Sequence, residues 1–230
     1  MSREIPPTER SKIKTNPVRA VYDAESIRRI IDESFVCHMG FAVNDQPFVI
    51  PVCYGRKEDR IYFHGARGSR IFKTLKTGAE ICVTISILDG IVLARSAFNH
   101  TINYRSVVIF GKAHELNSPG EKTDALKIIT EHIIPGRWDD VRKPTEKELH
   151  ATSLFSLKIN EASAKIRTGP PLDDEDDLNL EVWAGVLPLK IIDGKPIADI
   201  SKGKINGEDH IPEYLKNYKN RGLKVSVKGK

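Results

Sequence analysis

Short apolar runs with strand character recur roughly every 8–12 residues along this chain, and only a few helical segments interrupt them. Such spacing is typical of antiparallel sheets and barrels, because strands joined by hairpins need only short turns. Alternating βα units, which build parallel sheets, would need a helix between successive strands. The sequence therefore predicts a mainly β fold, an antiparallel barrel with few helices.

Turn and cap residues set the expected boundaries of these elements. Asn44-Asp45 and Asp89-Gly90 are expected to close hairpins, and Asp89-Gly90 is a strong turn dipeptide. Asp23 and Ser69 are expected to cap helices. The helices are expected at Ala24–Ser34, from Ser69 to Thr77, and at Gly120–Ile134. The strands are expected at Cys37–Val43, Phe48–Tyr54, Arg60–His64, Glu80–Leu88, Ile91–Ala94, Tyr104–Glu115, Leu154–Ile159 and Ala162–Arg167.

Composition places the chain among ordinary soluble proteins, with 40% hydrophobic and 29% charged residues. The longest apolar run, Ile81–Leu88, is too short to span a bilayer. The first residues are polar and contain no apolar signal region, so we expect a cytoplasmic protein. Cys37, Cys53 and Cys82 each lie in an apolar run without metal-ligand spacing, and we expect three reduced, buried thiols and no metal site.

The net charge of +5 is confined to one end of the chain. Residues 201–230 hold eight Lys or Arg against three acidic residues, 8 − 3 = +5, so the other 200 residues balance at 28 against 28. A basic terminus of this kind is more often solvated than a binding arm, and we expect no nucleic-acid partner. We divide the chain into an N-terminal arm (1–19), a body (20–190) and a basic tail (191–230).

The stretch YFHGARGSR, residues 62–70, is the first candidate for a binding site. A strand, a glycine-containing loop and a helix start follow one another, and backbone N–H groups at a helix start attract phosphate. Arg67 and Arg70 would add charged hydrogen bonds, Ser69 a hydroxyl, and Gly65 room for close approach. No pattern for a triphosphate or dinucleotide loop is present. A capped surface helix with solvated arginines explains the same residues equally well.

Polar residues at strand ends form the other candidates. Tyr104, Arg105 and Ser106 could meet the carbonyls and ring nitrogens of a flavin, or form an ordinary interstrand pair. His64 could relay protons, although no partner with nucleophile or metal spacing follows it. Trp183, with the basic pair Lys165 and Arg167 upstream, could cover a ring system, or pack on the body as a tail residue.

Five motifs in order resemble one known family: YFHGARGSR, LDGIVLARSAFNHTINYRSVVIFGKA, IIPGRW, ASAKIR with GPPLDDEDD, and VWAGVLPL. Between about Arg19 and Leu189 the chain is similar to the pyridoxamine 5′-phosphate oxidase-like FMN-binding split barrels. The resemblance is to the flavin-nucleotide-binding branch, which includes proteins related to 5-nitroimidazole-resistance reductases. It implies a six-stranded antiparallel split barrel and a homodimer with two FMN molecules at shared sites.

The resemblance also assigns roles to individual positions. It implies that the backbone of the strand at Val49, Ile50, Pro51 and Val52 lines the flavin. It also implies that Phe63 and His64 contact the flavin ring. Ser69 and Arg70 match the residues that bind the flavin phosphate. It implies that Trp183 reaches the flavin from the other subunit. The full set of cofactor-binding candidates is Val49, Ile50, Pro51, Val52, Phe63, His64, Gly65, Arg67, Ser69, Arg70, Tyr104, Arg105, Ser106, Lys165 and Trp183.

One departure from the family pattern bears on activity. After Trp183 the chain reads Gly185-Val186-Leu187-Pro188-Leu189 and lacks the arginines that grip pyridoxal phosphate in the oxidase, so vitamin B6 oxidation is not expected. The leading hypothesis is an NAD(P)H-linked FMN oxidoreductase acting on a small electrophile such as a nitroaromatic or a quinone. The alternatives are a flavin-binding or carrier protein without dedicated catalysis, and a heme-binding split barrel, which would need an axial histidine.

Overall fold

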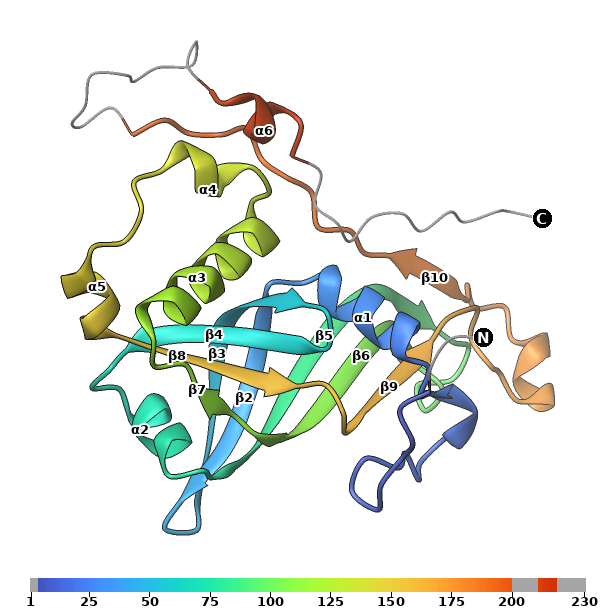
Figure 1. Cartoon of the computed structure of the whole chain (residues 1–230). Helices are drawn as coiled ribbons and strands as arrows, with labels where there is room; N and C mark the ends of the chain where they lie inside the picture. Colours follow the sequence, from blue (N-terminus) through green and yellow to red (C-terminus); the bar gives the residue numbers. More distant parts are fainter. Residues whose placement is uncertain (1–3, 200–210, 219–230) are drawn as a thin grey trace.

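The computed structural model describes residues 4–199 and 211–218 of the 230-residue chain, and it is dominated by one antiparallel sheet (Figure 1). Within the predicted basic tail, residues 200–210 and 219–230 lie outside the described residues. The strands are β1 (Ala20–Val21), β2 (Val36–Val43), β3 (Gln46–Lys57), β4 (Arg60–Ala66), β5 (Glu80–Leu93), β6 (Thr101–Lys112), β7 (His114–Glu115), β8 (Thr152–Lys158), β9 (Ala162–Arg167) and β10 (Gly185–Pro188). The helices are η1 (Pro17–Arg19), α1 (Ala24–Asp32), α2 (Arg70–Lys76), α3 (Pro119–Ile133), α4 (Arg137–Asp140), α5 (Glu146–Ala151), η2 (Glu175–Asn179) and α6 (Glu213–Lys216).

The order of the strands forces the sheet to curl. Along the sheet the order is β1-β9-β6-β5-β2-β3-β4-β8-β7, so β8 and β9 lie near opposite ends. Only residues 159–161 connect them, and three residues reach at most about 10 Å. The two ends must therefore come together, which confirms the predicted antiparallel split barrel. The sheet has ten strands where six were expected, and three of the ten, β1, β7 and β10, are short.

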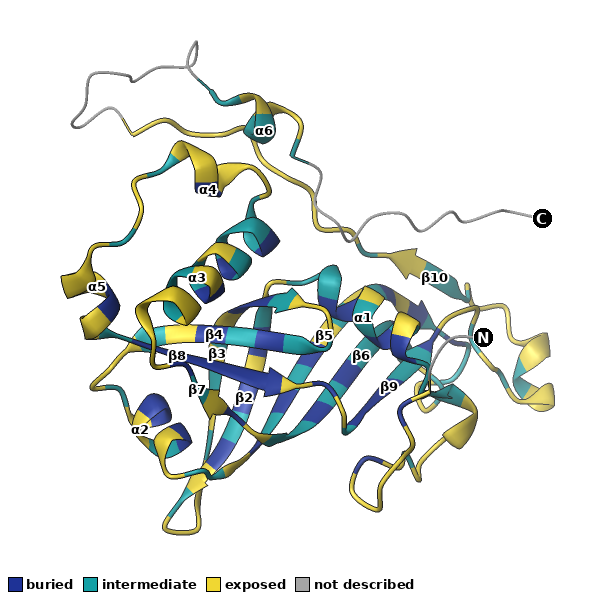
Figure 2. Cartoon of the chain, in the orientation of Figure 1, coloured by how far each residue is buried: buried dark blue, intermediate teal, exposed yellow. Residues whose placement is uncertain are grey.

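One hydrophobic core fills the inside of the curled sheet, as the alternation of buried and exposed residues along the strands shows (Figure 2). α1 closes this core with its predicted face, since Ile27, Ile30 and Ile31 are buried. Its predicted cap is present, because Asp23 accepts a 2.8 Å hydrogen bond from the Ser26 N–H. α2 buries Ile71, Phe72 and Leu75 in the same core.

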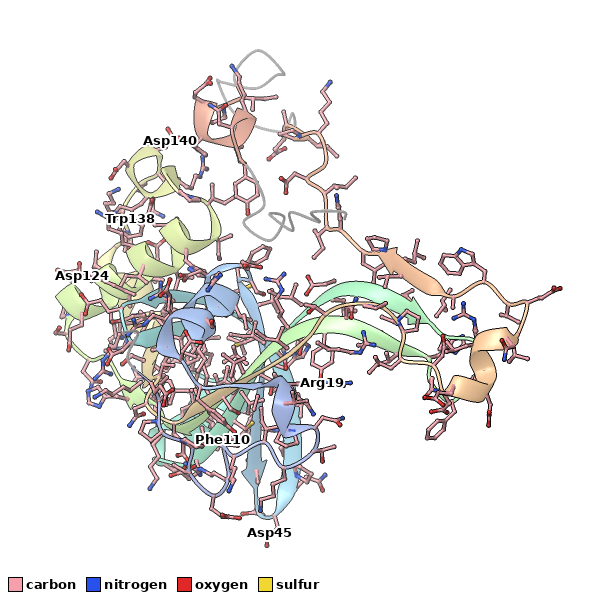
Figure 3. All side chains as sticks on the ribbon, turned by 90° about the vertical axis from the view of Figure 1, so that its right-hand side faces the viewer. Arg19, Asp45, Phe110, Asp124, Trp138 and Asp140 are labelled. Atoms are coloured by element: carbon pink, nitrogen blue, oxygen red, sulfur yellow. The ribbon has the colours of Figure 1, made fainter. Side chains whose placement is uncertain are left out.

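Three sequence predictions about local structure are wrong. Ser69 does not cap α2, because its side chain makes no hydrogen bond to the start of that helix. Asp89-Gly90 does not turn the chain, because β6 pairs with β5 on both sides of it, and the dipeptide forms an irregularity in the register between Leu88 and Gly90. The long β5–β6 hairpin therefore projects from the body, with β10 along β5 (Figure 3). The cysteines also differ from expectation. Only Cys37 is buried, whereas Cys53 is exposed and Cys82 half-buried, because both lie on the outer side of their strands.

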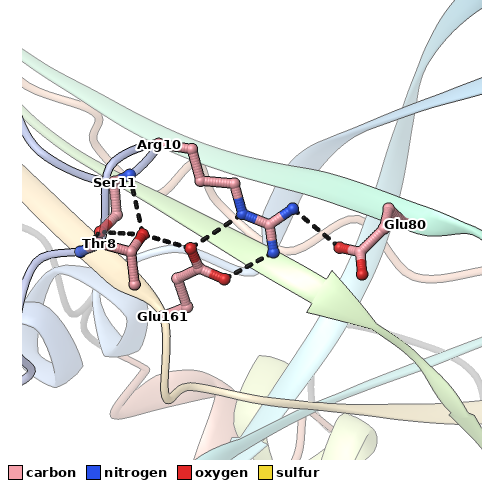
Figure 4. Close-up of polar contacts among 5 residues, drawn as sticks. All are labelled: Thr8, Arg10, Ser11, Glu80 and Glu161. Carbon is pink, nitrogen blue, oxygen red and sulfur yellow. Dashed lines mark hydrogen bonds and ion pairs between the residues drawn. The ribbon is translucent and has the colours of Figure 1, made fainter.

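The N-terminal segment is fastened to the sheet by a polar cluster around Arg10 (Figure 4). Its guanidinium donates to Glu161 at 2.8 and 2.6 Å and to Glu80 at 3.0 Å. The Thr8 hydroxyl donates to Glu161, and Arg10 lies over the Phe110 ring at 5.1 Å. The hydrogen bond to Arg10 lowers the pKa of Glu161, so this cluster weakens as the pH falls and the carboxylate takes up a proton.

Close backbone packing between α3 and β3 generates the first prediction. A Cβ at Gly55 would lie 2.6 Å from Ile129 Cα, so Gly55→Ala must push α3 away from the sheet. We expect a loss of about 1–3 kcal/mol in unfolding free energy, measured by urea denaturation. Gly120→Ala is the matched control, because nothing lies within 4 Å of its added methyl group. Equal stability of the two variants would contradict this packing.

Candidate functional site

The loop between β4 and α2 and the first residue of α2 combine an unsatisfied hydroxyl with two arginines that have no acidic partner. Ser69 precedes α2 without capping it, and its Oγ is buried with no hydrogen-bond partner. Within the described part of the chain, neither Arg67 nor Arg70 has an acidic partner. A buried hydroxyl without a partner is costly, and two guanidinium groups near it in the sequence, both without a carboxylate partner, favour an anion. These three side chains fit a phosphate group.

Neighbouring side chains hold this loop in place. The Arg70 guanidinium lies over the Phe48 ring at 4.4 Å from its centroid, a cation–π contact that restricts its direction. A Cβ at Gly65 would lie 2.2 Å from the Phe72 ring, so glycine is needed for α2 to pack here. The Arg67 N–H donates to the Ala151 carbonyl at 3.3 Å. The sequence identified Gly65 and Arg70 but missed Phe48, whose place across from the loop depends on the register.

β3 and β4 bring two of the predicted groups together. Val49 and Pro51 are exposed on the outer side of β3, with Ile50 and Val52 turned partly toward the core. His64 is exposed at the end of β4, where β3 and β4 part beyond the Tyr54–Phe63 pair. Arg70 lies over Phe48 of the same strand, so the Ser69 loop lies beside the part of β3 that β4 leaves unpaired.

Two candidates face away from this surface. Phe63 is fully buried in the core, so any contact it makes with a ligand would come from its backbone. The Arg105 guanidinium donates twice to Asp89, at 2.8 Å each, and also to Glu33. The bonds to Asp89, and then those to Glu33, raise the pKa of Arg105. Its donors are thus engaged within the chain, where they tie β6 to β5 and to the end of α1.

The remaining candidates form a separate group. Tyr104 and Ser106 lie on the outer side of β6, and Ser106 pairs in register with Lys165 of β9. Strands β5 and β2 lie between β6 and β3, so about 14 Å separates this group from β3. Trp183 precedes β10 on the projecting hairpin, 67% exposed, with its ring against Gly185. One chain therefore presents two half-sites rather than a single enclosed pocket.

The polar stretch 95–100 is organised by contacts that the sequence reasoning did not find. Arg95 donates from its backbone N–H and its guanidinium to the Asp173 carboxylate, both at 2.7 Å. Asp173 belongs to the acidic run that follows Pro170 and Pro171, and opposite charge in the two stretches was the available signal. The contact holds the acidic run against the tip of the β5–β6 hairpin. Among the described residues, no group of three metal-ligating side chains and no membrane-length apolar helix occurs.

Residues 23–166, more than half of the chain, match the family model described as pyridoxamine 5′-phosphate oxidase. The chain belongs to this family. A flavocytochrome from Azotobacter vinelandii is 38% identical, with 93% of this chain and 98% of that chain covered and a TM-score of 0.86. An FAD and heme binding protein from Mycobacterium smegmatis is 30% identical, with 86% and 96% covered and a TM-score of 0.81.

A third solved structure supports the fold alone. It is a protein from Bacteroides thetaiotaomicron described as a putative 5-nitroimidazole antibiotic resistance protein, 21% identical, with 64% of this chain and 86% of that chain covered and a TM-score of 0.55. No curated protein matches the chain. The predicted family and split-barrel fold are confirmed by these comparisons.

The environment of His64 generates a prediction about its protonation. Although part of the ring is exposed, burial by the surrounding protein lowers the pKa of His64 below 6.5. As the pH falls through 6.5 the unfolded chain takes up this proton first, so His64 makes the native state less stable on the acid side. We expect a midpoint below 6.5 in an NMR titration, with the signal assigned by its absence in His64→Gln. A midpoint at or above 6.5 would contradict the burial argument.

Proposed function

We propose that this family member is a flavin-dependent redox protein that holds the flavin phosphate at Ser69, Arg67 and Arg70. The buried, unpartnered Ser69 hydroxyl between two arginines without acidic partners is the observation that carries the proposal. Two similar proteins, a flavocytochrome and an FAD and heme binding protein, support a flavin ligand. The chemistry at stake is the ribityl phosphate that FMN and FAD share, and a preference for FMN stays a prediction.

The residues on the two half-sites would bind and orient this ligand. The exposed backbone edge of β3 at Val49–Val52 would line the ring, and His64 would lie at the point where β3 and β4 part. A bound flavin supplies hydride and single-electron transfer. NAD(P)H is the proposed electron donor, and a small electrophile such as a nitroaromatic or quinone the proposed acceptor. Vitamin B6 is excluded from the proposal, because residues 185–189 contain no arginine to hold a second phosphate.

Removing the Arg70 guanidinium should lower the affinity for FMN much more than the affinity for riboflavin. Arg70→Ala removes charged hydrogen bonds to the phosphate, which are each worth about 1.5–3 kcal/mol, so FMN affinity should fall by roughly 10- to 150-fold. Riboflavin lacks the phosphate and should lose little. Flavin fluorescence titration measures both ligands, and FAD titrated in parallel tests the FMN preference. Lys127→Ala, on the exposed side of α3, is the control. Equal losses for FMN and riboflavin would remove the phosphate role.

We propose that a second copy of the chain covers the side of the flavin that one chain leaves open. Large apolar side chains stand exposed along the hairpin and β10, with Trp183 at 67%, Leu88 at 54% and Leu187 at 54% exposure. Apolar surface of this kind marks an interaction site. In a homodimer, the outer face of β6 and Trp183 of one copy would cover the flavin held by the Ser69 loop of the other.

Assembly and flavin binding should therefore be coupled. FMN should raise the melting temperature of the dimer, and Trp183→Ala should weaken FMN binding while the barrel stays folded, because the residue lies outside the core. Sedimentation velocity with simultaneous flavin absorbance measures assembly and loading together. Phe98→Ala, at a ring that is 92% exposed in the loop after β5, serves as the control. A monomer with undiminished FMN affinity would reject the shared site.

Heme is a second candidate ligand, favoured by the two similar proteins that are described as a flavocytochrome and as an FAD and heme binding protein. An axial ligand needs an imidazole nitrogen without another bond, and within the described part of the chain His38 and His64 accept or donate no hydrogen bond through their rings. Both are exposed on the outer side of the sheet, and β3 pairs with β2 so that His38 lies beside Pro51. These residues fit an axial ligand.

Heme titration should then give a Soret band in the native chain that His38→Ala or His64→Ala abolishes. The imidazole supplies the iron ligand, so the variant that removes it should lose or shift the band while keeping its circular dichroism spectrum. His114→Ala, in the short strand β7, is the control. An unchanged band in both variants would rule out these histidines, and no band in the native chain would end the heme proposal.

A further inference from the structure

Near the hairpin, the outer face of β9, β6 and β5 carries cations and hydroxyls, and the carboxylate of β5 on this face, Glu80, lies at the far end beside Lys112. Residues that pair across antiparallel strands share a face, and Lys165 pairs with Ser106, which pairs with Ser86. One step along the same face, Arg167 pairs with Tyr104. Ala20 of β1 pairs with Lys165, which places Arg19 at the edge of this surface, below the point where the hairpin leaves the body (Figure 3).

Arg167 is the unusual member of this group because it is buried without a counter-ion. It is 5% exposed, and its guanidinium donates only to neutral acceptors, namely the Asn103 side chain and the carbonyls of Gly169 and Pro170. Its Nε is buried with no partner. Burial, and then the positive charge of Arg19, lower the pKa of Arg167. A buried charge is normally paired, so this arrangement lacks its compensating negative group.

The other cations do not provide that compensation. Within the described residues, neither Arg19 nor Lys165 makes an ion pair, and their like charges add to that of Arg167. The nearby loop holds the acidic run 173–177, but no ion pair in the described part of the chain joins that run to these cations, and Asp173 is bonded to Arg95. Three cations held together by the fold are stabilised by an anion between them.

We propose that Arg19, Lys165 and Arg167 form an anion subsite, separate from the Ser69 loop, for a diphosphate or carboxylate group of a cofactor. The hydroxyls of Ser106 and Tyr104 on the same face would complete its donors. The proposal that the anion belongs to a cofactor rests on the proposed function. The subsite itself does not, since strands β5, β2 and β3 separate it from the Ser69 loop within one chain.

Inorganic pyrophosphate in an Arg70→Ala background tests the subsite alone, because the first phosphate site is then disabled. Calorimetry at constant ionic strength should show binding that Lys165→Gln weakens at least tenfold and Lys112→Gln leaves unchanged. Lys112 is the matched control, since it lies on the same face at the far end of β6. Absence of binding in the Arg70→Ala protein, or equal losses in the two lysine variants, would overturn the subsite.

Thermal stability distinguishes a role in the subsite from a structural role, because the two change the melting temperature of the ligand-free protein in opposite directions. Arg19→Gln removes a like charge, so it should raise the melting temperature of the ligand-free protein and abolish the further rise that pyrophosphate gives. A fall in the ligand-free melting temperature would mean that Arg19 is a structural contact, and would overturn its place in the subsite.

Two ligand pairs identify the source of the anion. If it is the diphosphate of FAD, Lys165→Gln weakens FAD and spares FMN. If it is a heme propionate, the same substitution weakens heme and spares heme dimethyl ester. If Lys165→Gln binds each of the four ligands as tightly as the native chain does, the assignment of the anion to a cofactor is overturned. The outcome for Arg70→Ala with FMN is independent of these results, so failure of the proposed function and failure of the subsite are distinguishable.

Discussion

The short connection between β8 and β9 is the constraint on which the shape of the whole sheet depends. Three residues join strands from opposite ends of the sheet, so the sheet must curl around its core. Curling places one side of each strand inside and leaves the other side facing out. α3 covers the outer side of β3 and β4 where Gly55 admits its backbone. Val49 and Pro51 stay exposed further along the outer side of β3, where the first half-site lies, and the second half-site lies on the outer side of β6.

An ion network explains why the long hairpin can project from this barrel without a core of its own. Arg105 links Asp89 of β5 to Glu33 at the end of α1, and all three side chains are about 15–16% exposed. Partly buried pairs with bidentate geometry hold direction better than surface pairs do. The network fixes the irregular point of β5 at the mouth of the barrel. β10 also attaches there, since the Leu189 N–H donates to the Asp89 carbonyl at 3.1 Å.

Local patterns predicted those parts of the fold that depend on neighbouring residues. The face of α1, its Asp23 cap, the turn at Asn44-Asp45 and the bounds of β9 all follow from residues close in sequence. The turn predicted at Asp89-Gly90 is wrong because pairing with β6 outweighs the strong local turn preference of these two residues. Arg105 was assigned to a ligand since its acidic partners lie 16 and 72 residues away, and no local pattern reveals them. Phe48 was missed for the same reason.

Three side chains in this molecule lack the partner or the cover that their chemistry requires. Ser69 keeps a buried hydroxyl without a partner, Arg167 keeps a buried charge without a counter-ion, and Trp183 keeps a large ring in water. Each costs free energy in the isolated chain, and a fold selected for stability alone would remove it. A negatively charged group would stabilise Ser69 and Arg167, and an apolar surface would cover Trp183. A nucleotide cofactor between two copies of the chain would supply both, because its phosphates and its flat ring reach different ends of the same ligand. Under the proposed function, the split barrel would form one half of a binding site, and a second barrel would form the other half.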